Sequence, residues 1–223
     1  MSRYADEEIV DSWRANAGPW CEAVREGRIE SRELITNSAI IDAVLERSPN
    51  CALDAGCGEG WLVRALEQQG VTALGIDAIP ELVELASAEG VGKFRVLSYE
   101  DLSADDFEQR FDAVVCNFSL IGKESVSRLF AEVSALLTEG GALIVQTLHP
   151  IVVCGDREYV DGWRDGSWEG IGGDFSAPAP WYFRTVESWE SLYLSNGYSA
   201  CEIVEPFSTQ NKRPASLIMI GEK

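Results

Sequence analysis

The chain has little positive charge: its 223 residues include 18 Lys and Arg against 37 Asp and Glu, a formal net charge of −19. A protein that follows nucleic-acid phosphates needs clustered Lys and Arg, and an anionic membrane surface attracts the same residues. The sequence contains no basic run. This composition argues against a nucleic-acid partner and against membrane binding, and the acidic excess favours solubility.

Long apolar runs and metal-binding patterns are missing too. The longest apolar stretches, such as residues 141–145, are far shorter than the roughly 20 residues that cross a bilayer, and the acidic N-terminus has no signal-peptide core. The six cysteines form no Cys-x-x-Cys pair, the single His has no ligands at zinc spacing, and the acidic residues of 156–174 do not follow a calcium-loop pattern. We therefore expect a cytoplasmic protein with free thiols and no metal.

What the sequence does contain, from about residue 50, is an alternation of short apolar runs and helical stretches that end at glycines. Alternation of this kind predicts an α/β fold, in which helices cover a parallel sheet. The expected strands are 51–55, 71–76, 94–99, 111–118 and 142–148, and the expected helices between them are 61–69, 80–89 and 125–137. A chain of this length can bury one sizeable core.

Two segments flank this unit. Residues 6–47 have the pattern of two helices, whereas residues 150–180 are aperiodic and rich in glycine and aromatics, as functional loops often are. Thr185 is expected to cap a helix over 186–195. The last two strands, 200–204 and 216–220, are joined by a loop too short for a crossover helix, so they are expected to pair antiparallel.

A glycine-rich turn is the most informative motif. Residues 52–60 read Ala-Leu-Asp-Ala-Gly-Cys-Gly-Glu-Gly, directly after an expected strand and before a helix. Such glycines allow a ligand to approach the backbone, and a helix N-terminus offers free N–H donors. Asp77 ends the second strand, 21 residues after Gly56, at the distance where an acid accepts from ribose hydroxyls. Together these features predict an adenosine-containing ligand at the carboxyl ends of the strands.

The type of adenosine ligand depends on the rest of the turn. A dinucleotide fingerprint is Gly-x-Gly-x-x-Gly, but here Trp61 stands at the third glycine position and Glu59 would repel a pyrophosphate. A ligand with a positive centre suits this acidic turn better. Two alternatives stay open: an NAD-dependent oxidoreductase, and a non-catalytic cofactor-binding protein of the same fold, because a fold alone does not give function.

The sequence resembles the class I S-adenosylmethionine-dependent methyltransferases over about residues 30–223. The matching stretches are residues 53–60, 75–77, 111–116 and 137–145. The resemblance implies a Rossmann-like seven-stranded, mostly parallel sheet with helices on both faces and an antiparallel C-terminal strand pair. It also implies methyl transfer from S-adenosylmethionine to a small-molecule acceptor by in-line displacement. Residues 1–47 would form a helical lid, and 48–223 the methyltransferase domain, with 150–184 inserted on the substrate side.

The resemblance also assigns roles in cofactor binding. It places Asp54, Ala55, Gly56 and Gly58 near the methionine moiety, Asp77 on the ribose, and Ala78 or Ile79 against the adenine. Many members carry a Gly-Asp-like pair after the third strand; this sequence has Leu-Ser-Tyr-Glu instead, so the adenine candidates are Ser98, Tyr99 and Glu100. Asn117 falls at the methionine pocket, and Trp20 and Arg32 would close over the cofactor, unless they are a packing Trp and a solvated Arg.

The acceptor side is indicated by fewer residues. His149 follows the fifth strand, at the sheet edge that faces the crevice, and is the candidate general base; the alternative is a loop His in a His-Pro turn. Within 150–184, Trp181 and Tyr182 suit an aromatic substrate or a cationic product, and Arg184 suits a carboxylate. Their alternatives are a satellite core under the loop and a residue that positions the following helix. No pattern indicates the oligomeric state.

Overall fold

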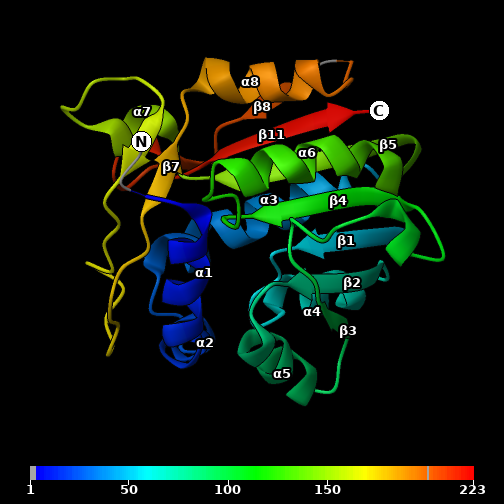
Figure 1. The fold of residues 1–223 in the computed structure, drawn as a ribbon, viewed down its shortest axis with the longest axis horizontal. Helices are drawn as coiled ribbons and strands as arrows, with labels where there is room; N and C mark the ends of the chain where they lie inside the picture. Colours follow the sequence, from blue (N-terminus) through cyan, green and yellow to red (C-terminus); the bar gives the residue numbers. More distant parts are fainter. Residues whose placement is uncertain (1–3, 200) are drawn as a thin grey trace.

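The computed structural model describes residues 4–199 and 201–223, and its centre is a seven-stranded sheet (Figure 1). The strand order is β3-β2-β1-β4-β5-β11-β8. These strands are β1 (Cys51–Ala55), β2 (Thr72–Asp77), β3 (Lys93–Val96), β4 (Phe111–Asn117), β5 (Leu137–Thr147), β8 (Glu202–Val204) and β11 (Leu217–Glu222). The first five are parallel, and β11 pairs antiparallel with both β5 and β8. The predicted α/β fold class and the antiparallel C-terminal pair are confirmed.

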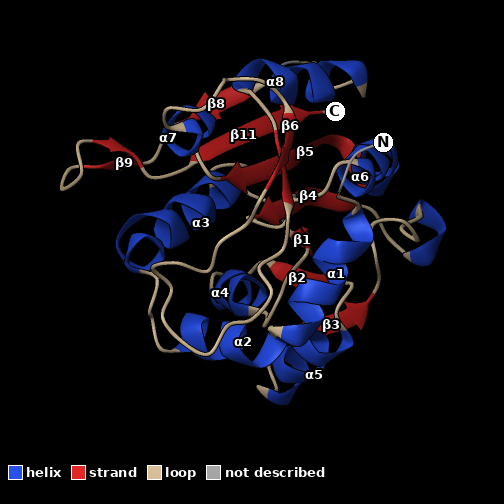
Figure 2. Ribbon diagram, turned by 60° about the vertical axis from the view of Figure 1, so that its left-hand side comes forward, coloured by secondary structure: helices blue, strands red, loops and turns tan. Residues whose placement is uncertain are grey.

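Helices cover both faces of the sheet (Figure 2). Because successive side chains of a strand point to opposite faces, Leu53 packs on one side with α6 (Glu124–Leu136) and α8 (Val186–Ser195). The preceding Ala52 packs on the other side with α3 (Asn37–Leu45) and α4 (Trp61–Gln68). The middle strands are therefore buried on both faces, which explains their nearly continuous apolar sequence. One more helix, α5 (Pro80–Ala88), packs against β2 and β3.

The N-terminal segment differs from the prediction of two helices over 6–47. It forms α1 (Asp6–Ala15), α2 (Ala17–Arg25), a π-helical turn (Arg32–Thr36) and α3. The break between α1 and α2 has a direct cause. Pro19 lacks the N–H that a continuous helix would donate to the carbonyl of Ala15, but a proline is tolerated in the first turn of a new helix. Residues 1–3, also part of the predicted lid, lie outside the described residues.

The ends of two strands and the content of the segment 150–180 also differ from the prediction. Strand β5 begins at Leu137 rather than at 142, with a register irregularity against β4, and β3 ends at Val96 rather than at 99. The segment 150–180, predicted as an aperiodic loop, contains α7 (Pro150–Cys154) and β6 (Gly162–Arg164), which pairs antiparallel with β7 (Trp181–Phe183) directly after the segment. A second hairpin, β9 (Phe207–Ser208) and β10 (Arg213–Pro214), precedes β11. Ala200, the first residue of the predicted strand 200–204, lies outside the described residues.

The helices are short, and α6, with 13 residues, turns one buried face to the sheet. Over residues 4–199 and 201–223, none of the helices has the length and apolar character needed to cross a bilayer. All six cysteines are free thiols. The sheet and its helices are thus joined by packing and hydrogen bonds.

One of these hydrogen-bonded joints is at Asp112, near the start of β4. Its Oδ2 accepts from the main-chain N–H groups of Asn50 (2.8 Å) and Cys51 (3.2 Å), and its Oδ1 accepts from the hydroxyl of Thr138 (3.1 Å). Burial raises the pKa of this carboxyl, but the hydrogen bonds from Asn50 and Cys51 outweigh burial and hold the pKa below its ordinary value. The carboxylate form therefore ties the starts of β1, β4 and β5 together.

Replacing this carboxylate should weaken the fold in a pH-dependent way. We expect Asp112→Ala to lower the free energy of unfolding by about 1–3 kcal/mol at pH 7. Because the folded-state pKa is depressed, the contribution is present above the unfolded pKa of about 3.9 and is lost as the pH falls through the folded pKa. Urea unfolding of both proteins at falling pH measures this, with Asp42→Ala, at an exposed position of α3, as the control. If the difference in the free energy of unfolding between the wild type and Asp112→Ala did not shrink at low pH, the Asp112 carboxylate would not stabilise the fold in this way.

Candidate active site

Two cavities open where the parallel strands end. The first, called here the turn cavity, has a volume of about 140 Å³ and is lined by the glycine-rich turn, the end of β2 and helices α1 and α2. The second, the insertion cavity, has a volume of about 410 Å³, and many of the residues that line it belong to the segment 166–184. Both are lined by Trp13, Trp20, Arg32, Phe118 and Ile121. Molecules bound in the two cavities would therefore meet at these shared residues.

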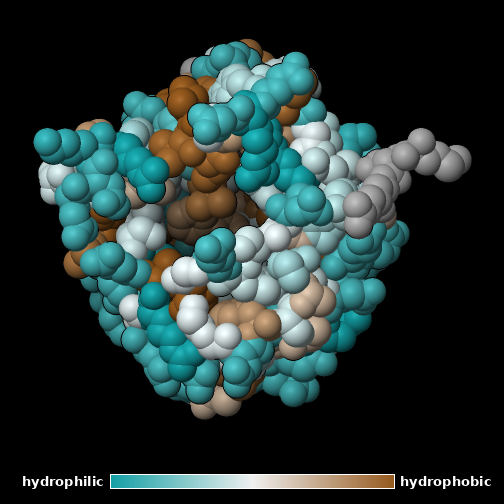
Figure 3. All heavy atoms as spheres, turned by 90° about the vertical axis from the view of Figure 1, so that its left-hand side faces the viewer, coloured by the Kyte–Doolittle hydropathy of each residue, from teal (hydrophilic) through white to brown (hydrophobic). Residues whose placement is uncertain are grey.

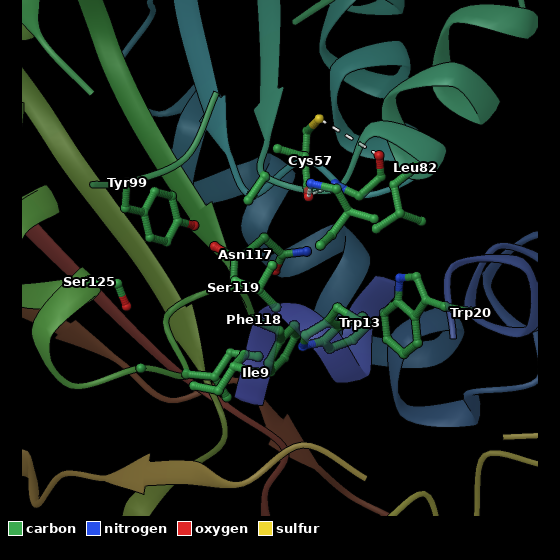
Figure 4. Close-up of a pocket in the computed structure, with 18 of the residues that line it drawn as sticks. Ile9, Trp13, Trp20, Cys57, Leu82, Tyr99, Asn117, Phe118, Ser119 and Ser125 are labelled. Atoms are coloured by element: carbon green, nitrogen blue, oxygen red, sulfur yellow. Dashed lines mark hydrogen bonds between the residues drawn. The ribbon is translucent and has the colours of Figure 1, made fainter. Parts of the chain in front are cut away.

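The glycine-rich turn is held by an unusually close approach to the loop after β4. Gly56 has φ +77°, and a Cβ there would lie 2.3 Å from the Cβ of Ser119 and 2.5 Å from the hydroxyl of Tyr99. The preceding carbonyl, of Ala55, accepts hydrogen bonds from the hydroxyls of Ser119 (2.7 Å) and Tyr99 (3.0 Å). Figure 4 shows Tyr99, Asn117 and Ser119 converging on this side of the turn cavity. A glycine is needed here because both the conformation and the space exclude a side chain.

Asp77 is fixed at the end of β2. Its Oδ2 accepts from the N–H of Gly58, and its Oδ1 accepts from the N–H of Ile79, both at 2.9 Å. Burial raises the pKa of Asp77, although these two hydrogen bonds oppose the change. Each carboxylate oxygen still has acceptor capacity, since each can take two hydrogen bonds. The side chain lines the turn cavity and can accept from the hydroxyls of a bound ligand.

Asp54 is a buried carboxyl in the wall of the turn cavity. It is 2 % exposed, and its Oδ1 has no hydrogen-bond partner among the described residues. Burial raises its pKa to about 8, the nearby Asp77 adds to this, and Arg32 opposes it. An orphaned carboxyl oxygen in a buried position is costly. It fits a ligand that brings a positive charge and N–H donors.

Arg32 lies between the two cavities, held by aromatic rings. Its guanidinium carbon is 5.5 Å from the ring centre of Trp20 and 5.2 Å from that of Trp61, and the side chain is 7 % exposed. Burial lowers its pKa, with Glu59, Glu33 and Asp54 acting in the opposite direction. The one hydrogen bond of its guanidinium to the described residues is donated by Nε to the Oδ1 of Asn37 (3.4 Å). The Nη groups are thus available to an anionic group of a ligand.

The predicted cofactor residues mostly come together. All of them line the turn cavity except Ala55 and Ser98. Ala55 supplies the carbonyl described above, whereas the hydroxyl of Ser98 bonds to Asp101 (2.8 Å) away from the cavity. On the acceptor side, Trp181, Tyr182 and Arg184 all line the insertion cavity. These placements match the expected division of roles, and the roles themselves stay predictions.

His149 is placed differently from the other candidates. It is 3 % exposed and lines neither cavity, although its neighbours Leu148 and Pro150 line the insertion cavity. Its Nε2 lies 2.7 Å from Oε1 of Glu205. A carboxylate only accepts, so Nε2 carries the proton in this pair and Nδ1 is the acceptor nitrogen. Nδ1 is buried and has no partner in the described part of the chain.

Several cavity residues were not predicted. Trp13 of α1 packs edge-to-face against Trp20, with ring centres 5.0 Å apart, and Figure 4 shows Trp13 beside Phe118. Phe118 adopts a left-handed conformation, φ +55°, at the end of β4. Non-glycine residues with positive φ are uncommon and are often found at functional sites. The i, i+4 spacing of Ile9 and Trp13 was the one available signal; nothing in the sequence marks Phe118.

The N-terminal helices and the insertion are fastened to each other. The Asn16 side chain donates to the carbonyl of Ser176 (2.7 Å) and accepts from its N–H (2.8 Å). Ser12 donates to the carbonyl of Ala177 (2.6 Å), and the rings of Trp13 and Trp168 meet edge-to-face at 5.3 Å. We call this set of contacts the clasp. It joins α1 and the start of α2 to the insertion over the cavities, and Figure 1 shows the insertion, in yellow, running beside these helices.

Sequence similarity to known proteins shows the family to which this chain belongs. A family model described as a methyltransferase domain matches residues 53–145. An uncharacterised methyltransferase of Mycobacterium bovis is 32% identical over 157 residues, which cover 64% of this chain and 75% of that protein. The chain belongs to the S-adenosylmethionine-dependent methyltransferases. This membership confirms the resemblance and displaces the NAD-dependent alternative.

Other methyltransferases match a smaller part or only the fold. The ubiquinone biosynthesis O-methyltransferase of Xylella fastidiosa is 34% identical over 102 residues, 44% of this chain; the chain spans only 41% of the length of that relative. The 1,6-didemethyltoxoflavin-N1-methyltransferase of Burkholderia thailandensis, solved with 1,6-didemethyltoxoflavin and S-adenosylhomocysteine, shares 20% identity and superposes with a TM-score of 0.65. That alignment covers 100% of this chain and 92% of the other and establishes a common fold.

The turn cavity of this methyltransferase fits the family's cofactor. S-adenosylmethionine carries an ammonium, a sulfonium, a carboxylate and ribose hydroxyls. The orphaned Oδ1 of Asp54 suits the positive groups, the free Nη groups of Arg32 suit the carboxylate, and Asp77 suits the hydroxyls. The buried carboxyl and guanidinium thus find in one molecule the partners that the protein does not supply.

The raised pKa of Asp54 leads to a prediction about pH. Its folded-state value of about 8 lies above the unfolded value of about 3.9, so the folded protein binds more protons between these values. The ligand-free protein should therefore lose stability as the pH rises from about 4 to about 8, by an amount on the order of a few kcal/mol. Asp54→Asn should show a flatter profile, because it removes the titrating carboxyl. Urea unfolding across this range measures both.

The comparison of the two profiles carries the test, since other groups titrate in both proteins. Asp42→Asn, at an exposed position of α3, is the matched control and should follow the wild-type profile. If the Asp54→Asn profile were as steep as that of the wild type, Asp54 would not be protonated at neutral pH.

Proposed function

We propose that the protein binds S-adenosylmethionine in the turn cavity and transfers its methyl group to a small-molecule acceptor in the insertion cavity. The observation that supports this most is the junction of the two cavities at Trp13, Trp20, Arg32, Phe118 and Ile121. When bound, the cofactor would supply a methyl group activated by a positively charged sulfur. The protein's part is to align the two molecules in line.

The cofactor contacts follow from the residues of the turn cavity. Asp54, Asn117 and the turn around Gly56 and Gly58 would hold the methionine moiety, and Arg32 its carboxylate. Asp77 would accept from the ribose hydroxyls, with Ala78, Tyr99 and Glu100 around the adenine. Trp20 would cover the sulfonium side, where an aromatic face stabilises positive charge. Ser98 is the weakest of these assignments because its hydroxyl is engaged by Asp101.

Residues 1–47 are proposed as a lid and 150–184 as the substrate-side insertion on the domain of residues 48–223. The clasp supports this division, because both segments are joined to each other across the cavities. Closing a site in this way excludes water and holds the reactants at a fixed separation. The six free thiols support the cytoplasm as the place of this reaction.

His149 is proposed as the general base when the acceptor must lose a proton. Glu205 accepts from its Nε2–H, which leaves Nδ1 as the basic nitrogen. Leu148 and Pro150, the neighbours of His149 in the chain, line the insertion cavity. To reach an acceptor there, the imidazole would have to enter that cavity, and the geometry of a ligand-free structure does not rule out a general base.

Cofactor binding is the first experiment. Calorimetric titration with S-adenosylhomocysteine, beside NAD on the same sample, should show micromolar binding of the former alone. Asp77→Ala should abolish it, because the ribose hydroxyls lose their acceptor and the turn loses the hydrogen bond at Gly58. Asp42→Ala, which removes a carboxyl at an exposed position of α3, should bind S-adenosylhomocysteine as tightly as the wild type does. Binding of neither ligand by the wild type would favour the non-catalytic alternative, and binding of NAD would contradict the proposal.

The role of His149 is tested separately, with an acceptor found by release of S-adenosylhomocysteine. At saturating cofactor, His149→Gln should lower the rate of transfer by about 10²- to 10⁴-fold, the usual contribution of a general base. The affinity for S-adenosylhomocysteine should be unchanged. Glu205→Gln should cause a smaller loss, because it still accepts from Nε2 through its amide oxygen. A full rate in His149→Gln would remove His149 from the mechanism.

A further inference from the structure

The insertion cavity has flat aromatic walls. Trp168, Trp181, Tyr182 and Phe183 come from the insertion, and Trp189 comes from α8. Figure 3 shows a hollow lined by hydrophobic residues on the face of the molecule that carries this segment. Aromatic rings pack best against other rings, in offset-stacked or edge-to-face arrangements. The walls therefore favour a planar, aromatic occupant over a flexible aliphatic one.

Arg184 adds a buried positive charge to these walls. It is 5 % exposed, with its guanidinium carbon 4.8 Å from the ring centre of Tyr182 and 5.0 Å from that of Trp189. Burial lowers its pKa to about 10, so it stays protonated at neutral pH. One Nη group donates to the carbonyl of Gly122 (2.8 Å), and the other donates to that of Lys123 (3.1 Å). These two bonds leave Nε and further Nη protons unused, since a guanidinium has five donors.

No carboxylate of the described residues forms an ion pair with Arg184. Arg32 is a second guanidinium on the same cavity wall, and Glu169, which is exposed, is the acidic residue that lines it. The residues that line the cavity thus include two buried guanidinium groups and one exposed carboxylate, although the protein as a whole carries a net charge of −19. Asp161, Asp6 and Glu124 act on Arg184 from outside the cavity lining and oppose the fall of its pKa, but none forms an ion pair with it. A buried guanidinium without an ion-pair partner is costly, and an anionic ligand would supply that partner.

These features decide between two occupants that suit aromatic walls. A cationic ligand would gain from the faces of the rings but would be repelled by the two buried guanidinium groups. An aromatic anion gains from both the rings and the charge. A carboxylate also matches the planar fork of an arginine, so its position in the cavity would be fixed as well as its charge.

We propose that the acceptor is an aromatic acid, with its ring between the aromatic side chains of the insertion and its carboxylate on Arg184. This inference rests on the proposed function, because it takes the insertion cavity as the acceptor site. Arg32 is left for the carboxylate of the cofactor, so the two arginines anchor the two reactants on either side of the shared wall. The carboxylate is the anchor, and the methylated atom is another group on the ring.

The charge of the occupant is tested first in the wild-type protein. With the turn cavity saturated by S-adenosylhomocysteine, calorimetry compares 2-naphthoate, 2-naphthamide and 2-naphthylmethylamine, which share one ring system and differ in charge. We expect the naphthoate to bind at least tenfold more tightly than the amide, and the amine to bind most weakly. Cyclohexanecarboxylate, which lacks the planar ring, should bind more weakly than the naphthoate. An amide equal to the acid, or an amine that binds most tightly, would overturn the proposal.

Variants of Arg184 then locate the anchor. Arg184→Gln should weaken 2-naphthoate by at least tenfold and leave 2-naphthamide unchanged, whereas Arg184→Lys should retain part of the preference for the acid. Arg128→Gln, a change on the exposed side of α6, is the matched control. Equal weakening of both probes in Arg184→Gln would show that the residue only supports the loop at Gly122 and Lys123, and would overturn its role as anchor.

The two proposals fail in different ways. If S-adenosylhomocysteine binds the wild type and the acid has no advantage, the substrate class is wrong and the proposed function stands. If S-adenosylhomocysteine does not bind, the proposed function fails and takes this inference with it.

Discussion

The close contact between Gly56 and the loop after β4 is the constraint on which the site depends. Because Gly56 has no side chain, the turn can approach Ser119 and Tyr99 closely. The hydroxyls of both residues donate hydrogen bonds to the carbonyl of Ala55. This contact joins the ends of β1 and β4, the neighbouring strands at the centre of the sheet. This contact fixes the strand ends that form the floor of the turn cavity, including Asp54. Phe118, which lines both cavities, lies between Asn117 at the end of β4 and Ser119.

Charge is distributed unevenly around that point. The turn cavity holds the buried carboxyl of Asp54 and the partly buried carboxyl of Asp77, and Glu59 forms ion pairs with Arg25 and Arg64. The insertion cavity holds Arg184, and Arg32 lies where the two cavities meet. A cofactor with a positive sulfur would meet the carboxyls of the turn cavity, with Asp54 giving up its proton as the cofactor binds, and an acceptor with a negative group would meet Arg184. The charges inside the two cavities therefore differ from the net charge of −19 of the whole chain.

The sequence predicted those parts of the site that local rules determine. The strand, the glycine turn, the helix after it and Asp77 follow from apolar runs, backbone conformation and spacing along the chain. The division of the N-terminal segment was missed, although Pro19 carried the signal. Phe118 and the pairing of His149 with Glu205 were not predictable, because they depend on which distant segments pack together. Register and loop contacts of this kind are set by the tertiary fold and leave no local pattern.

The clasp has a consequence for how the molecule assembles. Asn16 and Ser176 are 160 residues apart, and their hydrogen bonds need the sheet between them to be in place. Closing a long loop costs entropy that the few contacts of the clasp have to repay. The parts of the cavity walls that α1 and the insertion supply should therefore open more readily than the strand ends beneath them and exchange their amide hydrogens sooner under native conditions. The core can thus be complete in a molecule whose cavities have not yet closed.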